Sequence, residues 1–332
     1  MTSSDPSLPQ ASQQIDVVRR EIGKLIVGHQ EVVDGVLIAL LAGGHVLLEG
    51  VPGLGKTTLL RTLSRALQLK YSRIQFTPDL MPADIVGSMI METDGNGIKN
   101  LRFQSGPVFA HLVLADEINR ATPKTQSALL EAMQERTVTS GTVTHELEDP
   151  FLVMATQNPL EMEGTYPLPE AQLDRFLMKI LVRYPTRQEL DLIVQRTMAA
   201  SQPQIERVVD RAQILEVRRA AREVLVAPHV RDFATSLVLA TQPEQAEAHA
   251  LAKRYIRYGS SPRGAQALIL GGRVLALMRG RWNASIDDLS ELALPCLRHR
   301  IILNFDAHAE GKTPDSILTE ILAAIPTPAR TH

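Results

Sequence analysis

The sequence lacks the features that would mark a secreted or membrane protein. Cys296 is the only cysteine, so an intramolecular disulfide is excluded and a reducing compartment is favoured. No stretch approaches about 18 uninterrupted apolar residues, so no transmembrane helix is expected. The polar start, 1–14, has no apolar run of the signal-peptide type. We therefore expect a cytoplasmic protein without membrane insertion.

A surplus of charge of one sign is also missing. Lys and Arg number 35, against 37 Asp and Glu, in a chain of 332 residues. Domains whose main task is to hold nucleic acid are usually basic. The balance therefore argues against nucleic acid as the main partner, although it leaves a local basic patch open. The length predicts about two domains.

Short apolar runs alternate with helical patterns in the first half of the chain. Buried strands are predicted at 45–49, 72–76, 112–115, 151–155 and 177–182. Strands that alternate with helices predict an α/β fold, in which a mostly parallel five-stranded sheet has helices on both faces. Two segments interrupt this alternation, and their turn residues predict β-hairpin insertions near 88–103 and 136–146.

The second half shows helical patterns and no further clear strand. Thr186 and Glu189 have the spacing of a capping box that opens a helix. Further helices are predicted at 210–226, 229–241, 262–280, 286–300 and 314–324. We therefore divide the chain into a disordered tail at 1–14, an α/β core at 15–183 and an all-helical domain at 184–332.

A phosphate-binding pattern, G-x-x-x-x-G-K-[ST], begins at Gly50 and ends with Gly55, Lys56 and Thr57. A strand precedes it and a helix follows, as the motif requires. Glycines let backbone N–H groups point at phosphate oxygens, and the helix N-terminus favours anions. Lys56 is expected to reach the β- and γ-phosphates of ATP, and the Thr57 hydroxyl to ligate Mg²⁺. The remaining nucleotide contacts of the loop are predicted at Pro52, Gly53, Leu54 and Thr58.

Polar residues follow two of the predicted strands. Asp116 and Glu117 end the strand at 112–115, and Asn158 follows the strand at 151–155. Asp116 is expected to hold Mg²⁺, mostly through water, and Glu117 to orient and deprotonate the attacking water. Ligands bind outside the carboxyl ends of strands in such sheets, so Asn158 is placed to hydrogen-bond the γ-phosphate or that water.

Two arginines are candidates for stabilising charge on the γ-phosphate. Arg175 precedes the last strand, and Arg263 begins a helix of the second domain, where it could couple the nucleotide state to movement of that domain. Arg120, in the turn after the acidic pair, is open to two interpretations. It either contacts an adjacent subunit or only solvates the turn.

These elements, in this order, resemble the AAA+ superfamily and, within it, the MoxR family. The resemblance covers about 15–325. It rests on the strings IVGHQ at 26–30, GVPGLGKT at 50–57, DEINRA at 116–121, QSALLEAMQE at 126–135, ATQNP at 155–159, LPEAQLDRF at 168–176 and SPR at 261–263. The first string matches the box on the adenine side, which adds Val27, Gly28 and His29 to the expected nucleotide contacts.

The resemblance implies how the protein works. MoxR-like proteins form hexameric rings with each nucleotide between two subunits, so Arg175 matches the finger arginine and Arg263 the second sensor. The helical half matches a lid domain, and the two hairpins match the helix-2 insert and the pre-sensor-1 hairpin. The family resembles chaperones that remodel client proteins or assist metal insertion, often with a partner that carries a von Willebrand factor A domain.

Two alternative functions stay open on the sequence. One is a nucleic-acid motor, because hairpin-bearing relatives include MCM helicases, and the other is the motor subunit of a metal chelatase. A hairpin that tracks DNA needs cations. The segment 137–145 has none, and the insert offers Lys99 and Arg102 against Glu92 and Asp94. Protein remodelling is therefore favoured, with the client unidentified.

Overall fold

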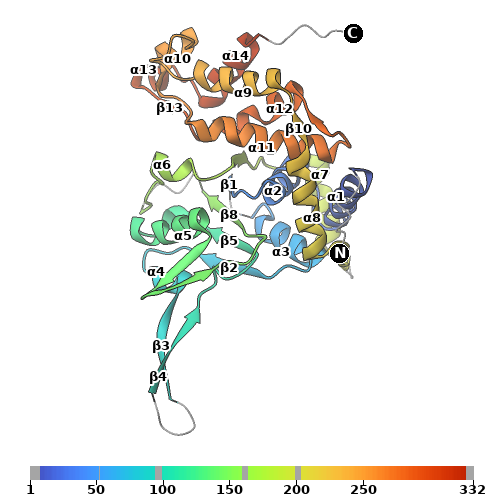
Figure 1. The fold of residues 1–332 in the computed structure, drawn as a ribbon, viewed down its shortest axis with the longest axis vertical. Helices are drawn as coiled ribbons and strands as arrows, with labels where there is room; N and C mark the ends of the chain where they lie inside the picture. The colour runs from blue at the N-terminus through green and yellow to red at the C-terminus, as the bar shows by residue number, and fades with distance from the viewer. Residues whose placement is uncertain (1–7, 52, 94–98, 159–163, 199–202, 327–332) are drawn as a thin grey trace.

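A parallel five-stranded sheet forms the centre of the computed structural model, which describes residues 8–51, 53–93, 99–158, 164–198 and 203–326 (Figure 1). The strand order is β2-β5-β8-β1-β9, and every neighbouring pair is parallel. The strands are β1 (Val46–Glu49), β2 (Tyr71–Gln75), β5 (Leu112–Asp116), β8 (Leu152–Gln157) and β9 (Met178–Leu181). All five predicted strands and the predicted sheet are confirmed.

Helices cover both faces of this sheet because its strands are apolar on both sides. In β5, Leu112 and Leu114 belong to one buried cluster, whereas Val113 and Ala115 belong to another. Helices α1 to α3 contribute to the first cluster, and α4 and α5 to the second. Their bounds are α1 (Leu8–Gly23), α2 (Gln30–Ala42), α3 (Lys56–Ala66), α4 (Pro82–Val86) and α5 (Pro123–Glu135), and α6 (Glu170–Leu173) precedes β9.

Both predicted hairpins are present. Strand β3 (Gly87–Thr93) pairs antiparallel with β4 (Lys99–Ser105), and this hairpin projects away from the sheet in Figure 1. Strand β6 (Thr137–Ser140) pairs with β7 (Val143–Glu146). The rings of Phe103 and His145 stack with centroids 4.1 Å apart, which joins the two hairpins near their bases. Asp94, in the insert, lies outside the described residues.

The expected tail at 1–14 is wrong from Leu8 onward, where α1 begins. Ala11, Ile15, Val18 and Ile22 are buried on one side of this helix. Their spacing of four, three and four residues is a helical period. Gln10 and Gln13, on either side of Ala11, are exposed, and polar residues of this kind gave the segment its disordered composition. Residues 1–7 lie outside the described part of the chain.

The second half is a helical region, as predicted, and it also contains two small sheets that were not predicted. Two small sheets join β10 (Leu225–Val226) with β12 (Asn283–Ala284) and β11 (Ile256–Tyr258) with β13 (Ile302–Leu303). Strands of two or three residues are too short to leave a periodic pattern. The helices are α7 (Arg187–Met198), α8 (Arg211–Glu223), α9 (Pro228–Ala240), α10 (Ala250–Tyr255), α11 (Pro262–Met278), α12 (Ile286–Leu297), α13 (Phe305–Ala309) and α14 (Pro314–Ala324).

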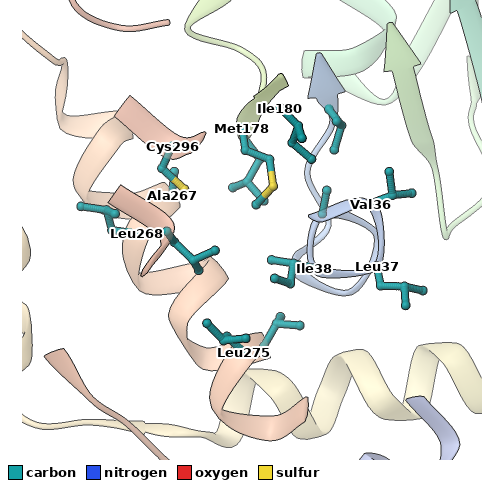
Figure 2. Close-up of a cluster of buried hydrophobic side chains, with 14 of the residues drawn as sticks. Val36, Leu37, Ile38, Met178, Ile180, Ala267, Leu268, Leu275 and Cys296 are labelled. Atoms are coloured by element: carbon teal, nitrogen blue, oxygen red, sulfur yellow. The ribbon is translucent and has the colours of Figure 1, made fainter. Parts of the chain in front are cut away.

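The helical half shares its core with the sheet. Figure 2 shows Val36 and Ile38 of α2 and Ile180 of β9 in one apolar cluster with Leu268 and Leu275 of α11. A single buried cluster therefore crosses the predicted boundary between 183 and 184. In the described part of the chain, we find no helix with the length and apolarity that a bilayer crossing requires.

Candidate nucleotide site

The phosphate loop connects β1 to α3, as the motif predicts. Gly53 and Gly55 have φ angles of 84° and 76°, in the left-handed region that favours glycine. Helix α3 begins directly afterwards, at Lys56. The loop therefore places the free N–H groups of a helix N-terminus beside the carboxyl edge of the sheet. Pro52, a predicted contact, lies outside the described residues.

Lys56 lies where the loop meets the acidic strand end. Its ammonium group donates a hydrogen bond of 2.6 Å to the carbonyl oxygen of Gly50. Burial lowers the pKa of Lys56, and the nearby carboxylates of Asp116, Glu117 and Glu49 oppose that shift. The cation thus faces three acidic side chains across a partly desolvated gap, where a phosphate would meet it.

A cavity of about 630 Å³ opens beside the loop. This volume is within the range of about 300–1,000 Å³ that ligand pockets usually have. The predicted contacts that line the cavity are Val27, His29, Gly53, Leu54, Gly55, Lys56, Thr57 and Thr58. Gly28 lies between two of these and adopts φ 66°, so the 26–30 segment turns into α2 at the cavity wall.

The cavity also has apolar walls. Val182, Tyr184, Leu190 and Ile193 line it together with Val27. Leu190 and Ile193 come from α7, which the capping box starts: Thr186 N and Oγ1 each lie 2.8 Å from Glu189 Oε2. The cavity thus combines cationic residues, which suit phosphates, with apolar residues, which suit a base.

The acidic pair lies at the carboxyl ends of β5 and β8. The Thr156 hydroxyl donates to Asp116 Oδ1 at 2.7 Å and accepts from the Glu117 backbone N–H at 2.8 Å. The other Asp116 oxygen, Oδ2, accepts from Arg73 Nη2 at 2.7 Å. One threonine hydroxyl therefore fixes both acidic residues against the neighbouring strand.

Glu117 has an unusual backbone conformation. Its φ of 56° and ψ of 51° are left-handed, which is uncommon outside glycine and clusters at functional sites. Its Oε2 accepts hydrogen bonds from Gln75 Nε2 at 3.0 Å and from Arg120 Nη1 at 3.2 Å. The turn therefore directs the carboxylate away from the line of β5, and Arg120, whose role was open, holds it.

Asn158 lies beside the same edge. It is 8% exposed and follows β8, whose last residue, Gln157, accepts a hydrogen bond from Gly50 N at 3.3 Å. Asn158 is therefore adjacent to the beginning of the phosphate loop, as predicted. The structure brings the loop, the acidic pair and this amide together.

Thr57 and Asp116 fit a magnesium ion. A hydroxyl and one carboxylate are hard oxygen ligands, and Mg²⁺ keeps most of its other positions for water and phosphate oxygens. Thr156 holds the Asp116 carboxylate in place at 2.7 Å, while Thr57 lines the cavity from the first turn of α3. When bound, the ion would neutralise phosphate charge.

Arg175 and Arg263 lie elsewhere. Met178 of β9 pairs with Val46 at the amino end of β1, whereas the phosphate loop follows Glu49 at the carboxyl end. Arg175 precedes β9, and Arg263 Nη1 lies 3.6 Å from Asp174 Oδ2. Both arginines line a second cavity of about 190 Å³. Neither arginine lines the nucleotide cavity. Asp116, Glu117 and Asn158 do not line it either, but they follow β5 and β8 at the carboxyl edge of the sheet, where the phosphate loop begins.

The sequence analysis missed several residues of the site. Arg61, Arg65 and Arg196 also line the nucleotide cavity. The spacing of 57, 61 and 65 puts the first two on the Thr57 side of α3, so helical periodicity could have found them. Arg73 could not be found in this way, because its contact with Asp116 depends on the pairing of β2 with β5.

Comparison with known proteins agrees with this fold. Residues 45–178 match the model of the ATPase family associated with various cellular activities (AAA), and 248–321 match an AAA lid domain. The chain is 43% identical to Chaperone MoxR1 of Mycobacterium tuberculosis, over 93% of this chain and 81% of that protein. It is 32% identical to Protein MoxR of Paracoccus denitrificans, over 92% and 94%.

A solved structure has the same fold. The crystal structure of a "putative ATPase" from Cytophaga hutchinsonii is 40% identical, has a TM-score of 0.89 and covers 96% of each chain. The fold and the phosphate loop define a nucleotide-binding protein of the AAA+ class. Within that class, the chain belongs to the MoxR family.

Proposed function

We propose that this protein hydrolyses ATP at the cavity between the phosphate loop and α7. The observation that carries the proposal is the convergence of Lys56, Asp116, Glu117 and Asn158 at one edge of the sheet. A half-buried cation and three side chains with carboxylate or amide groups, beside a helix N-terminus, suit phosphoryl transfer, in which catalysis is mainly positioning and charge stabilisation.

Each residue has a role that follows from its contacts. Lys56 and the loop N–H groups bind the β- and γ-phosphates, while Thr57 and Asp116 hold Mg²⁺. Glu117, turned out of the strand by its left-handed backbone, accepts the proton of the attacking water. Asn158 orients that water or the γ-phosphate. Val27 and Tyr184, which line the cavity, contact the base.

The arginines complete the site from a neighbouring subunit. Within one chain, Arg175 and Arg263 lie at the amino ends of the strands and the phosphate loop at the carboxyl ends. A head-to-tail contact between two copies brings such opposite ends together, and repetition of that contact closes a ring. We therefore propose a homo-oligomeric ring, hexameric as in the family resemblance, with Arg175 and Arg263 acting in trans.

The work done by this ATPase is proposed to be chaperone-like remodelling of a client protein. The name of its relative Chaperone MoxR1 supports this role. The β3–β4 hairpin supports it too, since Met91 and Leu101 are 65% and 69% exposed, whereas Arg102 is paired with Glu92 at 3.2 Å. Exposed apolar residues suit protein contact better than phosphate contact, which disfavours the nucleic-acid motor.

A partner with a von Willebrand factor A domain remains part of the proposal, on the family resemblance alone, and a chelatase motor is its alternative. If remodelling is correct, a client should stay bound to the ring with ATP and leave after hydrolysis. A ring that holds no protein either with ATP or after hydrolysis, yet binds DNA, would favour the nucleic-acid motor over protein remodelling.

Two substitutions separate binding from chemistry. Lys56→Ala should abolish ATP binding, because the loop loses its cation. Glu117→Gln should bind ATP normally but lower kcat by about 10²–10⁴-fold, because an amide cannot accept the proton. Calorimetric titration and phosphate release would measure both, with Lys312→Ala on the surface of the lid as the control. Undiminished ATP affinity in Lys56→Ala would refute the proposed phosphate site.

A further inference from the structure

Asp174, the residue before the proposed finger arginine, joins the two halves of the protein. Its carboxylate accepts hydrogen bonds from the Ser261 hydroxyl, 2.9 Å from each oxygen, and from Arg300 Nε at 2.9 Å. Arg263 Nη1 lies 3.6 Å from the same group. All three partners belong to the helical half, so one core carboxylate gathers three lid residues.

Arg300 holds the backbone of the segment that contains Arg175. Its side chain is only 3% exposed. Nη2 donates to Phe176 O at 2.7 Å and to Asp174 O at 3.2 Å, and Nη1 donates to Leu177 O at 3.2 Å and to Cys296 O. With the Nε bond to Asp174, all five N–H groups of the guanidinium have acceptors, so its planar fork fixes this segment against the lid.

Ser261 positions the other arginine. It is the N-cap of α11, and its Oγ accepts from Arg263 N at 3.1 Å while the hydroxyl donates to Asp174. The first turn of α11 is therefore tied to the residue beside Arg175. Both arginines are linked to one point, Arg175 by its covalent bond to Asp174 and Arg263 through Ser261 and the ion pair. The Arg175 guanidinium also donates to Leu130 O of α5 at 2.8 Å, which holds its side chain against the core.

We infer that Asp174, Ser261 and Arg300 form a clamp that presents Arg175 and Arg263 as one unit to the neighbouring subunit's nucleotide. This inference rests on the proposed trans role of the two arginines. A buried ion pair is a poor source of net stability compared with apolar packing, and its best-attested benefit is a defined geometry. The three residues are positioning residues, and neither Asp174, Ser261 nor Arg300 lines the nucleotide cavity of its own chain.

Ser261→Ala tests the clamp, because it removes the link between α11 and Asp174 and leaves the buried ion pair intact. Thr313→Ala is a matched control: Thr313 Oγ1 caps α14 by accepting from Ser316 N at 3.1 Å, and the hydrogen bonds described for that hydroxyl do not involve Asp174. Both changes remove one N-cap hydroxyl from the lid, and Ser261→Ala also removes the hydrogen bond to Asp174, so its loss of thermal stability should be the larger of the two.

Turnover should distinguish the two variants. A misplacement of about 1 Å can reduce rate up to about 100-fold, so Ser261→Ala should lower kcat on the order of tenfold or more with ATP affinity unchanged. Thr313→Ala should keep full turnover. Mixing Ser261→Ala with Lys56→Ala subunits should restore activity, because the latter supply an intact arginine pair to the former's phosphate loops. A merely structural role would give no such rescue.

The clamp is overturned if Ser261→Ala turns over ATP as fast as Thr313→Ala, or if its loss is not restored by mixing. Arg300→Lys, which keeps the charge and loses the planar fork, should show the same loss and rescue. Arg175→Ala mixed with Lys56→Ala tests the proposed function separately. If the Arg175→Ala and Lys56→Ala mixture stays inactive, the proposed trans role of the arginines is wrong. If that mixture regains activity but Ser261→Ala alone is fully active, only the clamp is wrong.

Discussion

Two neighbouring carboxylates, Asp116 and Glu117, have different surroundings and therefore different proposed roles. Asp116 is held between Arg73 and Thr156 at the end of a strand. Glu117 adopts a left-handed backbone that costs about 1–3 kcal/mol outside glycine. It keeps this conformation because its N–H bonds Thr156 and its carbonyl accepts from Arg120 N at 2.9 Å. The backbone strain at Glu117 thus accompanies the direction in which its carboxylate points.

At this scale the sequence predicted the site unevenly. Lys56, Thr57, Asp116 and Glu117 were predicted because each follows a strand within a local motif. The contact of Arg73 with Asp116 joins residues 43 apart, so it depends on which strands are neighbours. The adjacency of Arg175 and Arg263 escaped prediction for the same reason, since it needs the lid packed on the amino end of β9.

His45 makes stability depend on pH. Its Nδ1 accepts from Val153 N at 3.0 Å and its Nε2 lies 3.1 Å from Met133 O, so the buried ring fits the neutral form. Burial lowers the pKa of His45 to about 4, from 6.5. The unfolded chain therefore takes up the proton first on acidification. The stability from neutral His45 is complete above about pH 6.5 and is lost as pH falls toward 4.

Urea unfolding across this range measures the effect. The wild type should lose about 3 kcal/mol more than His45→Gln between pH 7 and pH 4, because the variant lacks this titration. Carboxylates titrate in both proteins, so only the difference between them reports on His45. Parallel pH profiles would show that the ring is not the buried neutral group described here.

Long buried elements were the ones predicted well from sequence. The five core strands are continuous apolar runs, because a parallel sheet covered on both faces needs apolar side chains throughout. The α1 helix was predicted too short, since its first turns combine Ala11 with polar residues. Helices α10 and α13, of six and five residues, were missed because one or two turns show no period.

The α2–α11 contact should carry a large share of the stability. Leu268 is 0% exposed within the cluster in Figure 2, so Leu268→Ala removes apolar contacts and leaves a cavity. We expect a loss of about 2–5 kcal/mol in the free energy of unfolding. Leu225→Ala, at a residue 70% exposed, is the matched control and should change stability by less than about 0.5 kcal/mol. Equal effects in the two variants would contradict the shared core.

At the scale of the whole molecule, the two halves of the proposed ATPase site occupy opposite ends of one sheet. The phosphate loop and acidic pair are at the carboxyl ends of the strands, and the arginine pair is at the amino ends. Because α11 shares a core with α2 and β9, the lid holds Arg263 at that distant end. A single copy therefore carries both parts of the proposed site, but the two parts do not meet within that copy.

This arrangement predicts that ATP turnover at the phosphate loop depends on assembly of the subunits. ATP should bind to Lys56 of a lone subunit, while efficient turnover should need a neighbour's Arg175 and Arg263. The sequence alone supported this only through its family resemblance, because a ring contact leaves no local pattern. The structure supports it by geometry, because the two arginines lie at the amino ends of the strands and the phosphate loop lies at the carboxyl ends.

Complementation between two inactive variants tests this account most directly. Arg175→Ala keeps an intact phosphate loop but lacks the finger arginine. Lys56→Ala keeps the finger arginine but has a defective phosphate loop. Each protein alone should hydrolyse ATP poorly, and the kcat of Arg175→Ala should be about 10³-fold or more below that of the wild type. Mixed subunits should regain phosphate release, since some contacts pair an intact loop with an intact arginine. Mixed rings that assemble and stay inactive would contradict a site shared between subunits.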